Sequence, residues 1–213
     1  MSNDEKHRAT VIGPRFVEAV EYASKRHRAQ RKKGGDVPYV AHLLGVAALV
    51  LEDGGSEREA IASLLHDVVE DTGVSIKAIR KRFGRKVARI VDGCTDTRKQ
   101  KKRTAKNWKK RRTLVLDRLR DPCTSTSVMR VKAADSLYNA RSMSADLRRH
   151  GPEVWQRFHA GAVDQLWYYR SIAVIVSARL PGFLADELRV AVQDLERVSG
   201  WWFDVGHPQS SAS

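Results

Sequence analysis

The sequence predicts an all-α fold, a single-domain helical bundle. Apolar residues recur at helical spacing in almost every segment, and no segment alternates with period two for long enough to require a strand. The 213 residues contain no repeat and no linker long enough to separate two domains. We therefore expect one hydrophobic core that is enclosed by helices.

Turn-forming residues separate the expected helices. A turn over residues 53–56 divides the second helix from the third, and Ser75 is expected to be the N-cap of the fourth. Gly-Pro and Pro-Gly pairs at 151–152 and 181–182 delimit the later helices. The expected helices cover residues 16–28, 39–51, 57–71, a segment from Ser75 to Gly84, then 87–91, 128–147, 153–180 and 183–198.

The domain is expected over residues 15–200, with a basic loop at 98–112. Residues 1–14 are expected to be an N-terminal extension and residues 201–213 a C-terminal tail. No apolar run approaches the length of about 18 residues that a membrane span needs, and the polar N-terminus lacks the apolar core of a secretory signal. We expect a cytoplasmic protein without a membrane partner, and nothing in the sequence favours one oligomeric state.

Positive charge is concentrated in one segment. The chain has 39 Lys and Arg against 25 Asp and Glu, a formal net charge of +14. Residues 98–112 contain ten basic residues and no acid, which implies an anionic partner such as nucleotide phosphates, nucleic acid or an acidic surface. Three interpretations are open: a mobile lid over a phosphorylated substrate, a solvated loop, or a nucleic-acid-binding arm in which Trp108 stacks on bases.

A cluster of ionisable residues lies within the expected helix 57–71. On a continuous helix, His66, Asp67, Glu70 and Asp71 share one wall, opposite the apolar wall that faces the core. No Lys or Arg occurs between residues 58 and 77, so three carboxylates lie together without a local counter-charge. Because like charges repel, this pattern indicates a bound cation rather than a solvated helix face.

Two further polar residues occur on otherwise apolar helices. Taken alone, His42 could be a buried core histidine, and Asp135 could pair with Lys132. Together with His66 and Asp67 they provide two imidazoles and two carboxylates. This mixed set suits Mn²⁺, Fe²⁺ or Zn²⁺ better than Mg²⁺, and such an ion can generate hydroxide and polarise a phosphoryl group.

Five short motifs carry a family resemblance. They are Ala-Gln-Arg-Lys-Lys (29–33), Pro-Tyr-Val-Ala-His (38–42), Leu-Leu-His-Asp-Val-Val-Glu-Asp-Thr (64–72), Phe-Gly (83–84) and Lys-Ala-Ala-Asp-Ser-Leu-Tyr-Asn (132–139). In these the chain resembles the HD superfamily, and within it the hydrolase domain of the RelA/SpoT-type enzymes, especially the single-domain small alarmone hydrolases. The similarity extends from about residue 16 to 139, and more weakly to about 198.

The resemblance implies both an activity and roles for the residues. The activity is manganese-dependent hydrolysis of the 3′-pyrophosphate of (p)ppGpp to GDP or GTP and pyrophosphate, without synthetase activity. Glu70 and Asp71 would position and deprotonate the attacking water. One Mn²⁺ would be held by His42, His66, Asp67 and Asp135. The substrate would be bound by Arg31, Lys32, Lys33 and Asn139.

Alternatives to this reading concern the substrate and the class of protein. The same metal site could act on another phosphorylated purine, either (p)ppApp or the 2′-phosphate of NADPH. The chain could also be a basic nucleic-acid-binding protein that uses residues 98–112.

Three positions bear on how closely the chain follows the family pattern. Leu43 replaces the usual Pro after His42, which affects how the helix starts, and Ser136 replaces a usual Arg or Lys, which removes a cation near Asp135. The aromatic residues 167–169 lie where the family has aromatics near the nucleotide, but clustered aromatics on a helix more often pack in the core.

Overall fold

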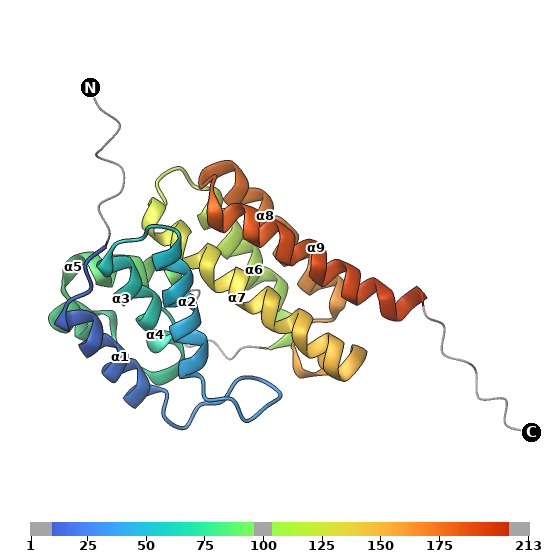
Figure 1. Ribbon diagram of the computed structural model, residues 1–213, viewed down its shortest axis with the longest axis horizontal. Helices are drawn as coiled ribbons and strands as arrows, with labels where there is room; N and C mark the ends of the chain where they lie inside the picture. Colours follow the sequence, from blue (N-terminus) through green and yellow to red (C-terminus); the bar gives the residue numbers. More distant parts are fainter. Residues whose placement is uncertain (1–9, 96–103, 205–213) are drawn as a thin grey trace, which may run out of the picture.

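Helices account for nearly all regular structure in residues 10–95 and 104–204, the parts of the chain that the computed structural model describes (Figure 1). The strand-like geometry described there is an isolated bridge between Arg31 and Pro38. The elements are α1 (Pro14–Arg26), α2 (Val40–Glu52), α3 (Glu57–Leu65), α4 (Val68–Thr72), α5 (Ile76–Cys94), α6 (Ala105–Arg120), α7 (Thr126–His150), the 3₁₀ helix η2 (Gly151–Arg157), α8 (Ala162–Arg179) and α9 (Phe183–Asp204). The all-α expectation is confirmed.

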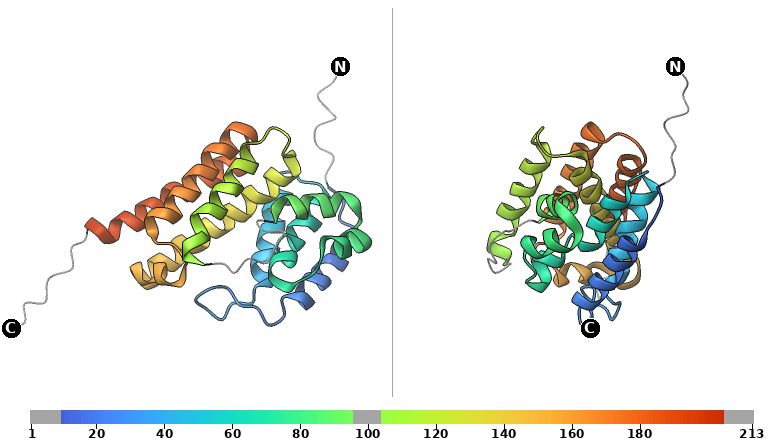
Figure 2. Two further views of the ribbon diagram at one scale, coloured as in Figure 1. Left: turned by 180° about the vertical axis from the view of Figure 1, so that it is seen from behind. Right: turned by 90° about the vertical axis from the view of Figure 1, so that its left-hand side faces the viewer.

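The long helix α7 lies at the centre of the molecule. It packs against α2, α3 and α5 on one side and against α8, α9 and η2 on the other. Figures 1 and 2 show the same division, with α1–α5 gathered at one end and α6–α9 at the other. A side chain on α7 can therefore contribute to any site that forms where these two groups of helices meet.

One apolar core runs through both groups of helices. Leu64, Leu65, Phe83, Leu137 and Leu188 are all 2% exposed or less. Burying an apolar side chain of this size contributes roughly 1.5–3 kcal/mol. The core therefore holds the inner faces of α3, α5, α7 and α9 in fixed positions, which also fixes the polar residues that border them.

The expected helix over residues 57–71 is wrong in one respect, because α3 ends at Leu65 and α4 begins only at Val68. The intervening His66 and Asp67 form a turn. The imidazole of His66 donates from Nδ1 to the carbonyl of Ser63 at 2.6 Å. In a continuous helix that carbonyl would accept the backbone N–H of Asp67, so the side chain competes with the helix at this point.

The expected loop over residues 98–112 is also wrong for its second half. Residues 98–103 lie outside the described part, but α6 begins at Ala105. Asn107 accepts a hydrogen bond from the backbone N–H of Thr104 at 3.1 Å, as in a capping box. Buried Trp108 and Leu116 then anchor the helix to the core.

The ends of other helices differ from the expected ones by smaller amounts. The expected helix 153–180 begins only at Ala162, after η2, and α9 continues to Asp204, into the expected tail. Residues 1–9 of the expected extension and 205–213 of the tail lie outside the described residues. The Ser75 cap is confirmed by its bond from the Ala78 N–H, and the Gly84 break by a φ of +86° within α5. Among the described helices, none is both long and apolar enough to cross a membrane.

Candidate metal centre

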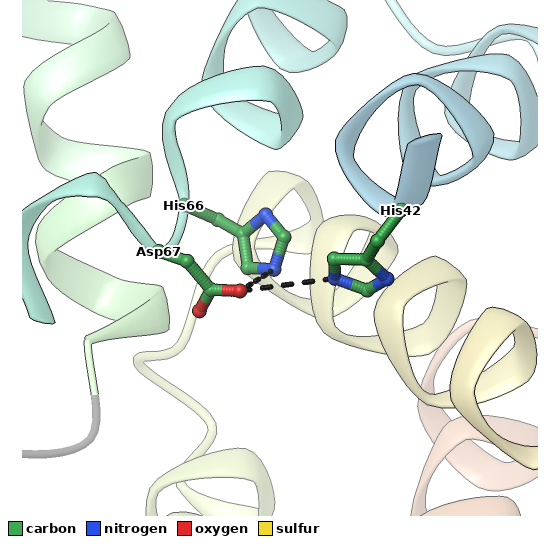
Figure 3. Close-up of side chains that lie close together, drawn as sticks. All are labelled: His42, His66 and Asp67. Atoms are coloured by element: carbon green, nitrogen blue, oxygen red, sulfur yellow. Dashed lines mark ion pairs between the residues drawn. The ribbon is translucent and has the colours of Figure 1, made fainter. Parts of the chain in front are cut away.

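Four of the predicted side chains converge where α2, α7 and the α3–α4 turn meet. Figure 3 shows the Asp67 carboxylate directed toward the rings of His42 and His66. Asp67 Oδ2 lies 3.0 Å from His66 Nε2 and 3.7 Å from His42 Nε2. Asp135 Oδ1, which comes from α7, lies 3.5 Å from His42 Nε2 and 3.7 Å from His66 Nε2. The ligand atoms predicted from the sequence thus share one small space.

The orientation of His66 suits metal ligation. Its Nδ1 donates to the Ser63 carbonyl, so in the neutral ring Nε2 carries the lone pair. The side chain is buried, and within residues 10–95 and 104–204 Nε2 makes no hydrogen bond, although Asp67 Oδ2 is close. A buried polar atom without a hydrogen bond is costly, and an ion at this position would satisfy it.

The electrostatics of the cluster also favour a cation. Burial lowers the pKa of His42 to about 4, so this imidazole is neutral at pH 7. Burial opposes ionisation of Asp67 and Asp135, but His66 and, for Asp135, Lys132 outweigh it, so the pKa of each carboxyl lies below its usual range. Burial also opposes the charged form of His66, but the two carboxylates outweigh it and raise the pKa of this imidazole. Without an ion this ring therefore holds the proton that offsets the carboxylates, and a bound metal would displace that proton and take over its charge.

The spacing of these donor atoms fits a single transition-metal ion. Ligand atoms about 2.1 Å from one ion are roughly 3.0–3.4 Å apart when the angle between them is near 90–109°. The observed separations of 3.0–3.7 Å are close to this range. Three of the residues, His42, His66 and Asp67, place their donor atoms within 4.8 Å of one another. The residues present therefore fit a divalent ion with mixed nitrogen and oxygen ligation.

Neighbouring side chains hold the two carboxylates in place. The Tyr39 hydroxyl donates to Asp67 Oδ2. On α7, Asn139 donates from Nδ2 to Asp135 Oδ1 at 2.6 Å, and Lys132 Nζ lies 3.3 Å from Asp135 Oδ2. Such contacts orient ligands and tune their basicity. Lys132 also supplies a buried cation beside Asp135, the pairing that the sequence left open, whereas Ser136 adds no cation at the next position.

A pocket opens beside this cluster and contains most of the predicted functional residues. Asp67 and the α4 carboxylates Glu70 and Asp71 contribute acidic groups to its lining, and α6 and α7 contribute cationic groups. Aromatic rings complete the walls. The pocket therefore joins an acidic, metal-compatible region to a basic region suited to phosphates. The predicted residues that line it are Lys32, Lys33, His42, Asp67, Glu70, Asp71, Asp135 and Asn139.

The predicted substrate-binding residues are not all in the pocket. Arg31 is exposed, donates to the carbonyls of Arg28 and Gln30 at 3.3 Å, and does not contribute to the lining. Lys32 donates to Ser142 and lies over the Tyr138 ring at 5.0 Å. Burial lowers the pKa of Lys32.

Two pocket residues were missed as individuals because the sequence presents them only within a basic run. Arg111 is buried and donates from Nε to Asn107 at 3.1 Å. Arg112 lies over the Tyr168 ring at 4.6 Å and donates to its hydroxyl at 3.4 Å. A helical reading of 105–120, with Trp108, Val115, Leu116 and Leu119 as its apolar stripe, would have placed both arginines next to the inward face.

Leu43 and most of the aromatic residues that the sequence singled out are buried in the structure. Trp108 is 4% exposed and packs edge-on against Tyr168, so it is not available to stack on nucleic-acid bases. Tyr168 and Tyr169 are buried, as expected for core residues, although Tyr169 also lines the pocket. Leu43 is the fourth residue of α2, not its first, and is fully buried, so the missing Pro does not affect where the helix starts.

Comparison with known proteins identifies the family. Residues 19–165 match the family model of the HD domain. The chain is 37% identical over 180 residues to guanosine-3′,5′-bis(diphosphate) 3′-pyrophosphohydrolase MESH1 of Xenopus tropicalis, which covers 81% of this chain and 94% of that protein. With human MESH1 the identity is 35% over 143 residues, 66% of this chain and 73% of that protein.

A solved structure agrees with this match. It is described as a metazoan ortholog of SpoT that hydrolyses ppGpp, and it superposes with a TM-score of 0.61 at 28% identity. The superposition covers 92% of this chain and 97% of that one. The HD-domain match spans both histidines and both aspartates of the metal-compatible cluster. The chain therefore belongs to the HD domain family.

Proposed function

We propose that this protein is a manganese-dependent hydrolase that removes the 3′-pyrophosphate from (p)ppGpp, with GDP or GTP and pyrophosphate as products. The observation that carries the proposal is the arrangement of the pocket. A two-histidine, two-aspartate cluster lies at a pocket whose lining also includes Glu70 and Asp71 and a set of basic residues, which we call the basic wall. The relatives named as guanosine-3′,5′-bis(diphosphate) 3′-pyrophosphohydrolases support the choice of substrate.

The residues divide the chemistry between them. His42, His66, Asp67 and Asp135 would hold the ion, which when bound supplies Lewis acidity toward a phosphoryl oxygen and lowers the pKa of water. Asp71 and Glu70 orient the attacking water and accept its proton. Water attacks the phosphorus that is bonded to the ribose 3′ oxygen, and the bond between these two atoms breaks. The 3′ oxygen takes up the proton that the water gave to the carboxylate, so the products are the nucleotide with a free 3′ hydroxyl and pyrophosphate.

The basic wall binds the phosphates. Lys132, Arg111 and Arg112 lie on the α6–α7 side of the pocket, and Lys32 and Lys33 come from the segment between α1 and α2. Their charges attract a substrate that carries two diphosphates and offset the negative charge that accumulates as pyrophosphate leaves. Asn139, which donates a hydrogen bond to Asp135, would contact the sugar or phosphate end of the nucleotide.

The test is to incubate the purified protein with ppGpp, ppApp and NADPH and to identify the products by chromatography. We expect ppGpp to be cleaved to GDP and pyrophosphate, with about one equivalent of metal per chain. Chelation should abolish the reaction, and Mn²⁺ should restore it better than Mg²⁺ because two ligands are imidazoles. Preferential cleavage of ppApp or NADPH would reassign the substrate, and full activity in excess chelator would contradict the metal mechanism.

A further inference from the structure

A chain of hydrogen bonds runs behind Asp71 and involves two residues to which the proposed mechanism gives no role. Gln30 donates from Nε2 to Asp71 Oδ2 at 2.9 Å. His27 Nδ1 lies 2.6 Å from Gln30 Oε1. His27 follows the last residue of α1, whereas Asp71 lies on α4, so the chain connects segments about 40 residues apart. A proposed catalytic carboxylate is thus tethered to a distant part of the fold.

The chemistry of the three groups fixes the direction of each bond. An ionised carboxylate only accepts hydrogen bonds, so the amide NH₂ of Gln30 has to face Asp71. The amide oxygen then faces His27, and Nδ1 of His27 has to carry a proton in either charge form of the ring. The amide orientation and the imidazole tautomer are therefore both determined by the carboxylate.

The burial of His27 indicates that the role of this side chain is the hydrogen bond from its Nδ1 to Gln30. The ring is 3% exposed and packs against the Tyr39 ring at a centroid distance of 5.2 Å. Within the described part of the chain, its Nε2 has no hydrogen-bond partner. A buried nitrogen without a partner costs free energy that an apolar side chain of similar size would avoid. What such a side chain could not supply is the Nδ1 donor to Gln30.

The backbone of Gln30 is itself held firmly. Its N–H donates to the His27 carbonyl at 2.8 Å, and its carbonyl accepts the N–H of Tyr39 at 3.0 Å. The Tyr39 hydroxyl in turn donates to Asp67. One segment therefore contacts two of the acids of the site, Asp71 through Gln30 and Asp67 through Tyr39. The same segment carries Lys32 and Lys33, which line the pocket.

We infer that Gln30, oriented by His27, is a positioning residue that fixes the plane of the Asp71 carboxylate for proton transfer from the attacking water. The inference rests on the proposed function, in which Asp71 accepts that proton. Asp71 lies on α4, and its Oδ2 accepts the hydrogen bond from Gln30. If the tether is lost, the carboxylate rotates away from the productive geometry, which lowers kcat while substrate binding is little changed.

The kinetic test uses variants that keep shape but remove chosen donors. Gln30→Met keeps side-chain length without either hydrogen bond, and we expect kcat for ppGpp to fall roughly 10-fold or more with KM within about 2-fold. His27→Leu removes the Nδ1 donor and should reduce kcat in the same direction. His27→Asn can donate from Nδ2 and should recover most of the loss. Gln193→Met, on the exposed surface of α9, is the matched control and should behave as wild type.

Two further results separate positioning from a general structural effect. Because Gln30 and His27 act on one contact, the double variant His27→Leu/Gln30→Met should be no slower than Gln30→Met alone. Metal content and Tm should stay close to wild type. A kcat for Gln30→Met within 2-fold of wild type, or additive losses in the double variant, would overturn the proposal.

A spectroscopic measurement tests the contact without relying on activity. In ¹⁵N-labelled protein with Mg²⁺ in place of paramagnetic Mn²⁺, the His27 ring should carry its proton on Nδ1. The side-chain amide signals of Gln30 should move in Asp71→Ala, which removes their acceptor. If wild type cleaves no nucleotide, the proposed function fails while these spectra still decide the contact. Unchanged Gln30 signals in Asp71→Ala would rule the contact out.

Discussion

At the scale of single residues, Glu70 and Asp71 differ from the four proposed ligand residues in position. They lie on α4, just after Asp67, and line the pocket, whereas the ligand atoms cluster around the two imidazoles. Glu70→Gln and Asp71→Asn keep the side-chain shape but remove the base. We expect metal content to persist while kcat falls by roughly 10²-fold or more and KM moves much less. Metal analysis with steady-state kinetics checks this, and loss of the metal in either variant would make that residue a ligand.

The sequence could indicate the proposed ligands but not the residues that support them. His66 and Asp67 are adjacent and lie among carboxylates without a local counter-charge, and His42 and Asp135 follow from recognisable motifs. The Tyr39–Asp67 and Gln30–Asp71 bonds join residues 28 and 41 positions apart. They depend on how the segment after α1 folds back onto the α3–α4 turn. A local sequence pattern does not predict such a long-range contact.

At the scale of elements, the start of α3 is stabilised by an ionic network. Ser56 and Glu59 form a capping box, and Arg130 of α7 donates to Glu59 at 2.6 Å and to Asp53 at 2.8 Å. Burial raises the pKa of Glu59, but the N–H and hydroxyl of Ser56 together with Arg130 outweigh it, so the pKa is lowered overall. This helix end is therefore tied to α7 through a charge that the folded state favours.

A pH-dependent loss of stability follows from this network. Glu59→Gln should lower the free energy of unfolding by roughly 2 kcal/mol at pH 7, because Arg130 loses a charged partner. A lowered folded pKa means that the stabilisation is complete above about pH 4.3, the unfolded value, and is lost as pH falls through the folded pKa. Urea titrations between pH 3 and 8 should show a difference in the free energy of unfolding between wild type and Glu59→Gln that disappears only at the acidic end. Glu52→Gln, at an exposed position, is the control. A difference between wild type and Glu59→Gln that does not change with pH would contradict the role of the Glu59 charge.

The basic helix α6 carries a second prediction at this scale. Arg112→Met should lower kcat/KM for ppGpp about 10-fold at low salt, because it removes a cation from the pocket wall. The loss should shrink at high ionic strength, which screens the wild-type charge. Lys110→Met, an exposed position on the same helix outside the pocket lining, should have a much smaller effect. Equal effects of the two substitutions would indicate a general influence of net charge.

The same helix explains why the expectation for residues 98–112 was only partly correct. Ten basic residues in fifteen suggested a basic loop, since charge dominates the pattern. The apolar stripe that anchors α6 is completed by Val115, Leu116 and Leu119, which lie beyond the charged run. The break at His66 and Asp67 was missed for a different reason, because the periodicity continues across it and a single side-chain bond interrupts the helix.

At the scale of the whole molecule, α9 packs against the helix that carries part of the site. It packs along α7, which carries Asp135 and Asn139, and Leu188 on α9 is fully buried. Leu188→Ala should lower the free energy of unfolding by about 2–4 kcal/mol, because it removes buried contacts and leaves a cavity. Folded protein should keep its metal and its kcat, since Leu188 does not line the pocket. Val190→Ala, 51% exposed on the same helix, is the control, and a selective loss of kcat in Leu188→Ala would contradict this separation.

The ligands of the proposed metal centre are far apart in sequence, with about 90 residues between His42 and Asp135. An ion that joins them is a reversible cross-link, and it closes a loop whose ends would otherwise have to be held together by packing alone. Because the unfolded chain lacks the assembled site, free metal at a thousand times its Kd would stabilise the fold by about 4 kcal/mol. We therefore expect resistance to heat and proteolysis to follow the free metal concentration, so that metal supply governs how much of the protein survives as well as how fast it works.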